Sequence, residues 1–372
     1  MQQAVDAVSG DYAVDQALAK ATQAILKPIA DQGHFNGIDQ LFLSPDSELH
    51  RLPFAALPAP GTPSKRLNQA FGLRLLTTGR DLITLLNPTP PSGPSALLAN
   101  PNFNAPWPAN GNPPKQSDAA TTPKKEDSGI ATSAQASSDP LTQQRSASLK
   151  DKVWEILPGT QTEADALAPL LNIQQPLTGD EANTARLFQQ QNPKILHIAT
   201  HGYFQESQPH PQDTSPAPAA REDPLLRSGI VLAGANVPLH NPSDDGYLTA
   251  AEATSLPLLG TELVTLSACD TGKGSQQTGE GIYGLQRSLQ VAGSRSTLLS
   301  LWRVDDQATA AFMQRFYEHL NNGSGRAQAL AQTQTDFQTL NSTDIGNGWN
   351  KDWSKPAVWA AFQLTGDWRA IP

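Results

Sequence analysis

The sequence predicts an α/β protein with a mostly parallel sheet and helices on both faces. Two stretches, residues 194–203 and 263–272, begin with apolar and β-branched residues and run into glycine, which is the pattern of a buried strand ending in a turn. Other runs of this kind alternate with segments whose apolar residues recur at helical spacing. Because parallel strands need long crossover connections, usually helices, this alternation favours a parallel sheet covered on each side.

Residues 1–92 are expected to contain one helix and two short strands. Residues 12–30 carry alanine and leucine at helical spacing and predict one amphipathic helix. Short strands are expected at 40–44 and 73–77. His50 lies between them, but no nucleophile is nearby in the sequence, and a proline turn accounts for the segment without catalysis.

The second expected unit is residues 93–372, and it begins with a strand at 96–101. Residues 104–150 then contain few large aliphatic side chains among proline, serine, threonine, glutamine and charged residues. Such a composition buries too little apolar surface to offset the entropy of ordering the chain. We therefore predict a disordered insertion in the first connection between a strand and a helix.

Regular elements are predicted again from Trp154 onwards, each from its periodicity and its turn residues. In chain order they are a helix capped by Thr162 and running to Leu171, a helix at 182–190, a strand ending at His201, a loop at 205–222, a strand at 228–233, a helix at 248–254, a strand ending at Cys269, a loop at 272–279, a helix from Gly281, a strand at 296–301, helices at 306–320 and 325–340, and a last strand near the C-terminal tryptophans.

The only cysteine of the chain, Cys269, and the histidine His201 are each predicted at the carboxyl end of a strand. Active sites of open α/β sheets lie at that edge. A cysteine nucleophile reacts as the thiolate, so it needs a neighbour such as histidine to accept its proton. Spacing alone leaves the alternative open that Cys269 is a small buried apolar residue and His201 a hydrogen-bonded histidine at a strand end.

Two other kinds of site are not expected. His197 and His201 have a spacing that suits a metal pair on a helix, but on a strand they lie far apart, so we expect no zinc site and interpret His197 as a core histidine. The glycines around Lys273 lack the spacing of a phosphate-binding loop. No cofactor is therefore predicted.

Composition limits the partners of the chain. The 372 residues carry a formal net charge of −9 without a long basic run, so nucleic acid is not an expected partner. The sequence shows neither the pattern of a signal peptide nor a membrane span, and its single cysteine suits a reducing compartment. We expect a soluble cytoplasmic protein.

Several motifs, in order along most of the chain, resemble those of the CHAT family of caspase-like peptidases, which is related to caspases, metacaspases and separases. They are Pro45-Asp46 with Leu49-His50-Arg51-Leu52-Pro53-Phe54, Leu157-Pro158-Gly159-Thr160 with Glu163-Ala164, His201-Gly202, Asp245-Gly246-Tyr247-Leu248-Thr249, Ser267-Ala268-Cys269-Asp270-Thr271-Gly272, Gly279-Glu280-Gly281, Leu301-Trp302-Arg303-Val304-Asp305-Asp306 and Trp359-Ala360-Ala361-Phe362-Gln363-Leu364-Thr365-Gly366-Asp367.

The resemblance implies a caspase-like sheet, preceded within residues 1–92 by a degenerate caspase-like subdomain, and a cysteine endopeptidase that cuts a protein substrate at a restricted site. Cys269 would be the nucleophile and His201 the general base and acid. The backbone amides of Gly202 and Cys269 would bind the oxyanion of the tetrahedral intermediate.

The resemblance to separases around Trp302 implies an acidic pocket for a basic P1 side chain. We assign that pocket to Asp305, assign Asp306 to the N-cap of the following helix, and regard Asp270 as a helper. Caspases have Gln-Ala-Cys-x-Gly around the nucleophile, whereas Ser267 stands here in place of the glutamine, so the caspase substrate preference is not carried over.

Members of the family often carry tetratricopeptide repeats before this region, which implies a repeat-type sensor region or an activating partner. A second hypothesis is a catalytically weak module that keeps the fold for signalling or scaffolding. The presence of Cys269 and His201-Gly202 argues against it.

Overall fold

The computed structural model describes residues 11–86, 88–106, 152–204, 224–237, 246–270, 278–340 and 351–372. The strands within them are β1 (Gln40–Leu43), β2 (Pro58–Ala59), β3 (Thr62–Arg66), β4 (Gly72–Leu75), β5 (Ala96–Pro101), β6 (Leu177–Gly179), β7 (Ile195–Phe204), β8 (Ser228–Val231), β9 (Tyr247–Thr249), β10 (Leu263–Asp270), β11 (Ser296–Ser300) and β12 (Phe362–Gly366).

The helices surround these strands. The α-helices are α2 (Asp11–Ala21), α3 (Lys27–Ala30), α4 (Leu67–Ala70), α5 (Asp81–Thr84), α7 (Pro158–Leu170), α8 (Thr184–Phe188), α9 (Ala250–Ala253), α10 (Thr278–Val291), α11 (Asp306–Asn321), α12 (Arg326–Gln338) and α14 (Pro356–Trp359). A π-helical turn, η2 (Thr22–Leu26), joins α2 to α3, and short 3-10 helices are η3 (Ser47–Arg51), η4 (Phe54–Ala56), η5 (Pro224–Leu226) and η6 (Lys351–Ser354).

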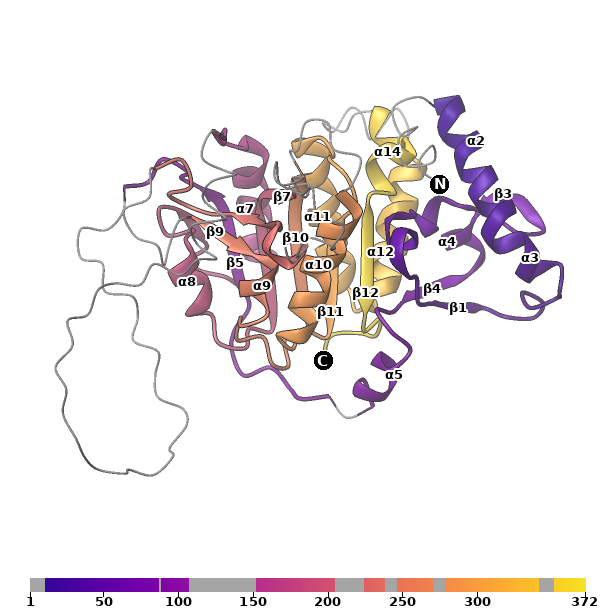
Figure 1. The fold of residues 1–372 in the computed structure, drawn as a ribbon, viewed down its shortest axis with the longest axis horizontal. Helices are drawn as coiled ribbons and strands as arrows, with labels where there is room; N and C mark the ends of the chain where they lie inside the picture. Colours follow the sequence, from indigo (N-terminus) through magenta and orange to yellow (C-terminus); the bar gives the residue numbers. More distant parts are fainter. Residues whose placement is uncertain are drawn as a thin grey trace, which may run out of the picture.

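A ten-stranded sheet forms the centre of the molecule (Figure 1). Its strand order is β1-β4-β12-β11-β10-β7-β5-β6, and β8 and β9 extend from the end of β7. Most neighbours are parallel, whereas β12 runs antiparallel to β11, and β7, β8 and β9 form antiparallel pairs. The architecture is the mostly parallel α/β sheet that the sequence predicts, and it is consistent with a caspase-like fold.

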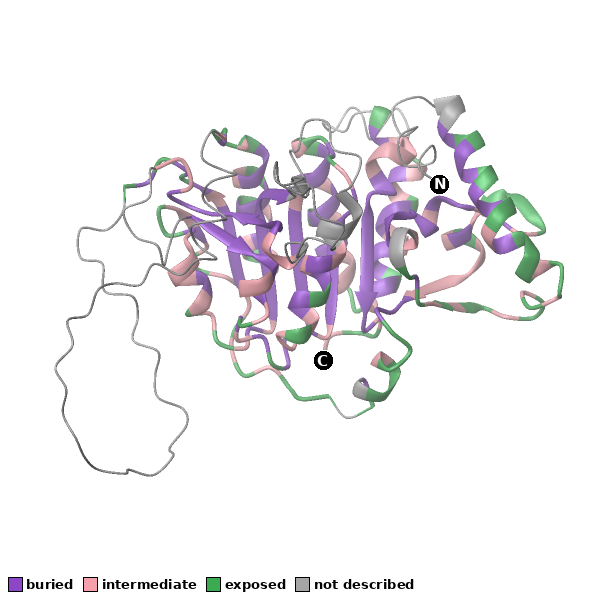
Figure 2. Ribbon diagram, viewed as in Figure 1, coloured by how far each residue is buried: buried purple, intermediate pink, exposed green. Residues whose placement is uncertain are grey.

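Successive residues of the central strands pack into two different cores. On β7, Ile195 and Ala199 pack with α7, α11 and α12, whereas Leu196 and Ile198 pack with side chains of α8, α9 and α10. Figure 2 shows the central strands buried along their length and the helices exposed on their outer sides. Side chains of a strand alternate between faces, so this pattern means that helices cover both faces of the sheet.

Most predicted elements are present within a few residues of their expected bounds. The helix predicted at 12–30 corresponds to the consecutive segments α2, η2 and α3. The expected N-cap at Thr162 is wrong, because α7 begins at Pro158, a residue suited to the first position of a helix. The helix expected at 248–254 is β9 followed by the single turn α9, which the capping box of Thr249 and Glu252 begins.

Two predictions about loops and one about disorder concern residues that are mostly outside the described ranges. The expected insertion at 104–150 falls there from residue 107 onwards, and so does the whole of the loop expected at 205–222. Residues 272–277 of the loop expected at 272–279 also lie outside the described ranges, and α10 already begins at Thr278.

Strands β1 and β4 from the N-terminal part join the same sheet through β12. All five residues of β12 pair with β11, but only Thr365 pairs with Leu75 of β4. The apolar core beneath is continuous, since Leu18 of α2 belongs to the same cluster as Phe312 of α11. The N-terminal part therefore shares its core with the rest of the chain.

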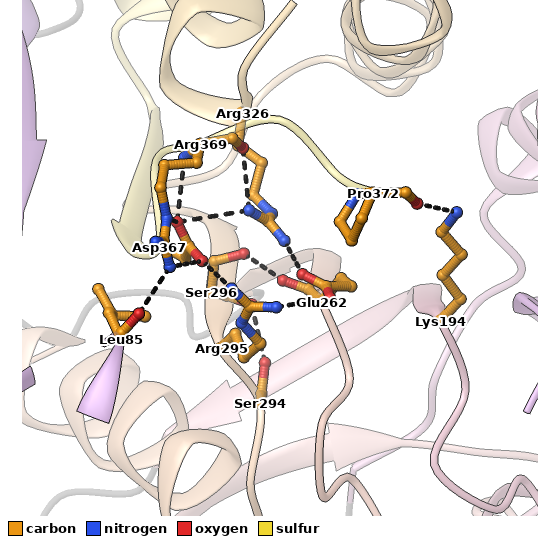
Figure 3. A network of polar contacts seen from close by, with 10 residues as sticks. All are labelled: Leu85, Lys194, Glu262, Ser294, Arg295, Ser296, Arg326, Asp367, Arg369 and Pro372. Atoms are coloured by element: carbon orange, nitrogen blue, oxygen red, sulfur yellow. Dashed lines mark hydrogen bonds and ion pairs between the residues drawn. The ribbon is translucent and has the colours of Figure 1, made fainter. Parts of the chain in front are cut away.

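A network of buried ion pairs joins the strands at the edge opposite the carboxyl ends of β7 and β10 (Figure 3). Glu262 precedes β10, Arg295 precedes β11 and Asp367 follows the antiparallel β12. Arg295 contacts both carboxylates, at 2.6 Å from Glu262, and Arg326 contacts Glu262 and lies 3.5 Å from Asp367. Glu262, Arg326 and Asp367 are 0% exposed. The network therefore fixes one end of three neighbouring strands.

The network is sensitive to acid. Burial raises the pKa of Asp367, but hydrogen bonds from Arg369 and the charges of Arg326 and Arg295 outweigh it and lower the pKa from 3.8 to about 2. The folded-state pKa lies below the ordinary value, so this stabilisation is complete above pH 3.8 and is lost as the pH falls towards 2.

Replacing Arg326 by methionine is expected to lower the free energy of unfolding by about 3 kcal/mol, because the oxygen of the buried Glu262 carboxylate that Arg326 contacts loses its partner, while Arg295 holds the other oxygen. Urea unfolding of the purified variant measures this loss. Lys27→Ala is the control, since Lys27 forms an exposed pair with Asp31 at i+4 and its loss should cost only about 0.3–0.5 kcal/mol. Equal unfolding midpoints of the two variants would contradict a structural role for the network.

Candidate active site

Strands β7 and β10 lie side by side, parallel and in register over eight residue pairs. The last two pairs are His201 opposite Cys269 and Gly202 opposite Asp270. Neighbouring strands are about 4.8 Å apart, so the register alone places His201 and Cys269 next to each other. Spacing in the sequence could not show this proximity. Cys269 is the last residue but one of β10, whereas β7 continues beyond His201 to Phe204 and pairs there with β8. The pairing of β7 with β10 ends at Gly202, so His201 and Cys269 lie at the carboxyl edge of the parallel part of the sheet, where α/β active sites form.

The ring of His201 has a defined orientation. Its Nε2 atom lies 2.8 Å from the carbonyl oxygen of Glu155. A carbonyl oxygen only accepts hydrogen bonds, so Nε2 carries the hydrogen and the lone pair of the neutral ring is on Nδ1. Nδ1 is buried and has no hydrogen-bond partner among the described residues. The imidazole is therefore arranged to accept a proton at Nδ1.

Aromatic side chains enclose the His201 ring. The ring of Trp154 lies 5.1 Å and that of Phe103 5.4 Å from it, centroid to centroid. Trp154 is 3% exposed, and its Nε1 atom donates a hydrogen bond of 2.8 Å to the hydroxyl of Tyr247. Sequence reasoning missed these residues and the Glu155 carbonyl. The only signal was that a large aromatic residue, Trp154, follows a long polar segment.

Burial is the main influence on the protonation of His201. It lowers the pKa of the imidazole below its ordinary value of 6.5, the hydrogen bond to the Glu155 carbonyl partly reverses this effect, and the positive charges of Lys152 and Arg303 lower the pKa further. The net shift is downward. The neutral ring, which is the form that accepts a proton, therefore persists at lower pH than in a free histidine.

A small cavity of about 20 Å³ adjoins His201. Charged and polar residues line it, among them Glu163, Ser267, Arg303 and Asp306. Burial raises the pKa of Asp306, the charge of Arg303 lowers it, and Asp305 and Glu163 raise it, with a net upward shift. The cavity has room for about one water molecule.

The prediction that Asp306 is the N-cap of the following helix is wrong. Helix α11 begins at Asp306, and the carboxylate of the preceding residue, Asp305, accepts hydrogen bonds from the amides of Gln307 and Ala308 at 3.1 and 3.0 Å. A capping residue precedes the first helical residue, so Asp305 is the cap. Asp306 lines the cavity, close to Gly159 at the start of α7.

The remaining predicted site residues are placed as follows. Asp270 pairs with Gly202, which also pairs with Ile230 of β8. His197 is fully buried, as expected of a core histidine, with Nε2 at 2.9 Å from Glu163. Within the part of the chain that the structure describes, no three acidic, histidine or cysteine residues are grouped to hold a metal ion.

No helix within the described ranges is both long and apolar enough to cross a membrane.

Comparisons with known proteins identify the family of the chain. A family model of the CHAT domain matches residues 15–367. Tetratricopeptide repeat protein 28 of Homo sapiens is 28% identical over 226 residues, and the protein of the same name from Mus musculus is 27% identical over 233 residues. Each match covers 58% of this chain and 9% of the much longer relative. Because the family model spans nearly the whole chain, this protein belongs to the CHAT family, which is related to the caspase-like cysteine peptidases.

Proposed function

We propose that the protein is a cysteine endopeptidase in which Cys269 is the nucleophile and His201 the general base and acid. The observation that supports this most is the register that sets His201 opposite Cys269, together with the unpartnered Nδ1 of His201. A cysteine nucleophile needs a base within reach, and this arrangement supplies one. Membership of a family related to cysteine peptidases adds support.

The proposed reaction proceeds by acyl transfer. Nδ1 of His201 takes the thiol proton, the sulfur attacks the carbonyl carbon of the scissile bond, and the amides of Gly202 and Cys269 hold the oxyanion. The imidazolium gives its proton to the leaving amine, while the Glu155 carbonyl stabilises the charge through Nε2–H. A water molecule, deprotonated by His201, then hydrolyses the thioester and regenerates the thiol.

The substrate of the proposed peptidase is a protein with a basic residue at P1. Asp306 supports this preference, since its carboxylate lines the cavity beside His201. The cavity holds about one water molecule, so the charged end of a lysine or arginine would displace that water, widen the cavity and form charge-assisted hydrogen bonds with the carboxylate. Asp270 is a secondary candidate. The names of the two relatives include tetratricopeptide repeats, which supports a repeat-type sensor region as the regulatory partner, and the single cysteine supports action in the cytoplasm.

Replacing either member of the dyad should abolish specific cleavage. Cys269→Ala and His201→Ala are each expected to lower kcat by about a thousandfold or more, and the double variant no further, because residues that act as a unit are not additive. A mass-spectrometric comparison of new N-termini in a proteome treated with wild type or Cys269→Ala measures the activity and identifies the cleavage site. The same termini in both samples, or additive losses, would refute the dyad.

The acid limb of the pH profile of kcat/KM should lie below pH 6.5, because burial lowers the pKa of the His201 imidazole and the base stays neutral in mild acid. Lys152→Gln removes a positive charge that lowers this pKa, so the acid limb of the profile should shift to higher pH. Initial rates between pH 4.5 and 8, at substrate concentrations well below KM, test both statements. An acid limb above 6.5 in the wild type would contradict them.

Asp306→Asn should reduce kcat/KM for a P1 arginine peptide more than for its P1 glutamine analogue, since only the former loses a charge-assisted hydrogen bond. Asp305→Asn is the matched control. It makes the same substitution at the neighbouring position, and asparagine also caps helices, so the start of α11 is preserved. A peptide series that differs only at P1 gives the comparison. If both variants keep the preference, or apolar P1 residues are cut best, Asp306 does not select the substrate.

A further inference from the structure

Five polar residues form a buried cluster on the face of the sheet that α7 and α11 cover, and we refer to them as the Glu163 cluster. Its members are Glu163, His197, Thr265, Ser267 and Tyr317, and none is more than 5% exposed. Polar groups are costly to bury unless hydrogen bonds replace their contacts with water. Here each member has a hydrogen-bond partner within the cluster.

Glu163 joins the two strands that carry the dyad. One carboxylate oxygen accepts a hydrogen bond from Nε2 of His197 on β7, at 2.9 Å, and the other accepts one from the hydroxyl of Ser267 on β10, also at 2.9 Å. His197 lies four residues before His201, and Ser267 lies two residues before Cys269. The Glu163 side chain of α7 thus bridges β7 and β10 close to His201 and Cys269.

Tyr317 of α11 forms a second bridge between the same strands. Its hydroxyl lies 3.1 Å from Nδ1 of His197 and 2.8 Å from the hydroxyl of Thr265. Both bridges use His197 on β7, but on β10 this one ends at Thr265, two residues further from Cys269 than Ser267. Tyr317 does not line the cavity beside His201, whereas Glu163 and Ser267 do.

The pairing of β7 with β10 sets the register of the two strands. Hydrogen bonds between side chains are directional, and their strength falls steeply as the geometry worsens. The two bonds of Glu163 therefore add a constraint on the ends of both strands at the level of the cavity.

We propose that Glu163 is a positioning residue for the dyad, and this inference rests on the proposed function. Its carboxylate holds His197 and Ser267, and through them it holds the ends of β7 and β10, whose register sets His201 opposite Cys269. The effect depends on the two hydrogen bonds and not on the charge. Glutamine preserves both bonds, since its carbonyl oxygen accepts from His197 and its amide donates to the Ser267 hydroxyl.

The test uses two readouts on the full chain. The first is the rate of alkylation of Cys269 by iodoacetamide as a function of pH, which is specific because the chain has one cysteine. The second is kcat and KM for a peptide identified from the proteome cleavage profile. The variants are Glu163→Ala and Glu163→Gln, with His201→Ala as the reference for a lost base and thermal melting as the check of folding.

Glu163→Ala is expected to slow alkylation at neutral pH to the level of His201→Ala and to lower kcat by about 100-fold with little change in KM, since a displacement of about 1 Å is enough for such a loss. Glu163→Gln should stay close to wild type in both readouts. If Glu163→Ala disturbs folding, Ser267→Ala breaks one of the two bonds, and Thr265→Val is its matched control on the same strand and face.

The inference would be overturned if Glu163→Ala folds and keeps the wild-type alkylation rate and kcat. It would also be overturned if Glu163→Ala and Glu163→Gln lose equal amounts of activity, or if Ser267→Ala and Thr265→Val do. If no peptide is cleaved but alkylation still depends on both His201 and Glu163, the proposed endopeptidase fails while the positioning role stands. If peptide cleavage requires His201 but not Glu163, the positioning role fails while the peptidase stands.

Discussion

The register between β7 and β10 is the constraint on which the candidate site depends. A shift by one residue would turn every side chain of one strand to the opposite face, so that His201 and Cys269 would no longer share a face. A shift by two residues would restore the face but move the pair about 6.6 Å apart along the strands. The chemistry proposed for this protein is therefore available in one pairing of the two strands.

Different interactions hold the neighbouring strands together at different levels of the sheet. At the amino edge, the carboxylates of Glu262 and Asp367 share two arginines and tie β10, β11 and β12 together. In the middle, apolar residues fill both faces. Near the carboxyl edge, Glu163 and Tyr317 link β7 to β10. Buried ion pairs add little net stability compared with apolar residues, but they penalise any arrangement in which a charge loses its partner.

Most of the fold could be predicted from the sequence, because strand and helix periodicity is a local property. The helix at residues 12–30 and the strands that end at His201 and Cys269 were predicted in this way. The contacts around His201 could not be, since they join residues far apart in the chain: Glu155 lies 46 residues from His201.

The two aspartates show a different limit of sequence reasoning. Asp305 and Asp306 are chemically equal, and either can cap a helix, so the position of the first helical residue decides their roles. Helix boundaries are the least certain part of a prediction from sequence. The predicted start of this helix was one residue too late, so the capping role was assigned to Asp306, which lines the cavity, and not to Asp305.

The close approach of Gly159 to α11 has a consequence for how this protein can vary. A β-carbon at position 159 would lie 2.9 Å from the carbonyl carbon of Asp306, so even alanine would force the starts of α7 and α11 apart. The cavity beside His201 can therefore change its charge through a substitution at 306 while the backbone stays in place. It cannot change its shape through a larger residue at 159 without moving both helices. Selection for a new substrate would act on one of these positions and leave the other constant.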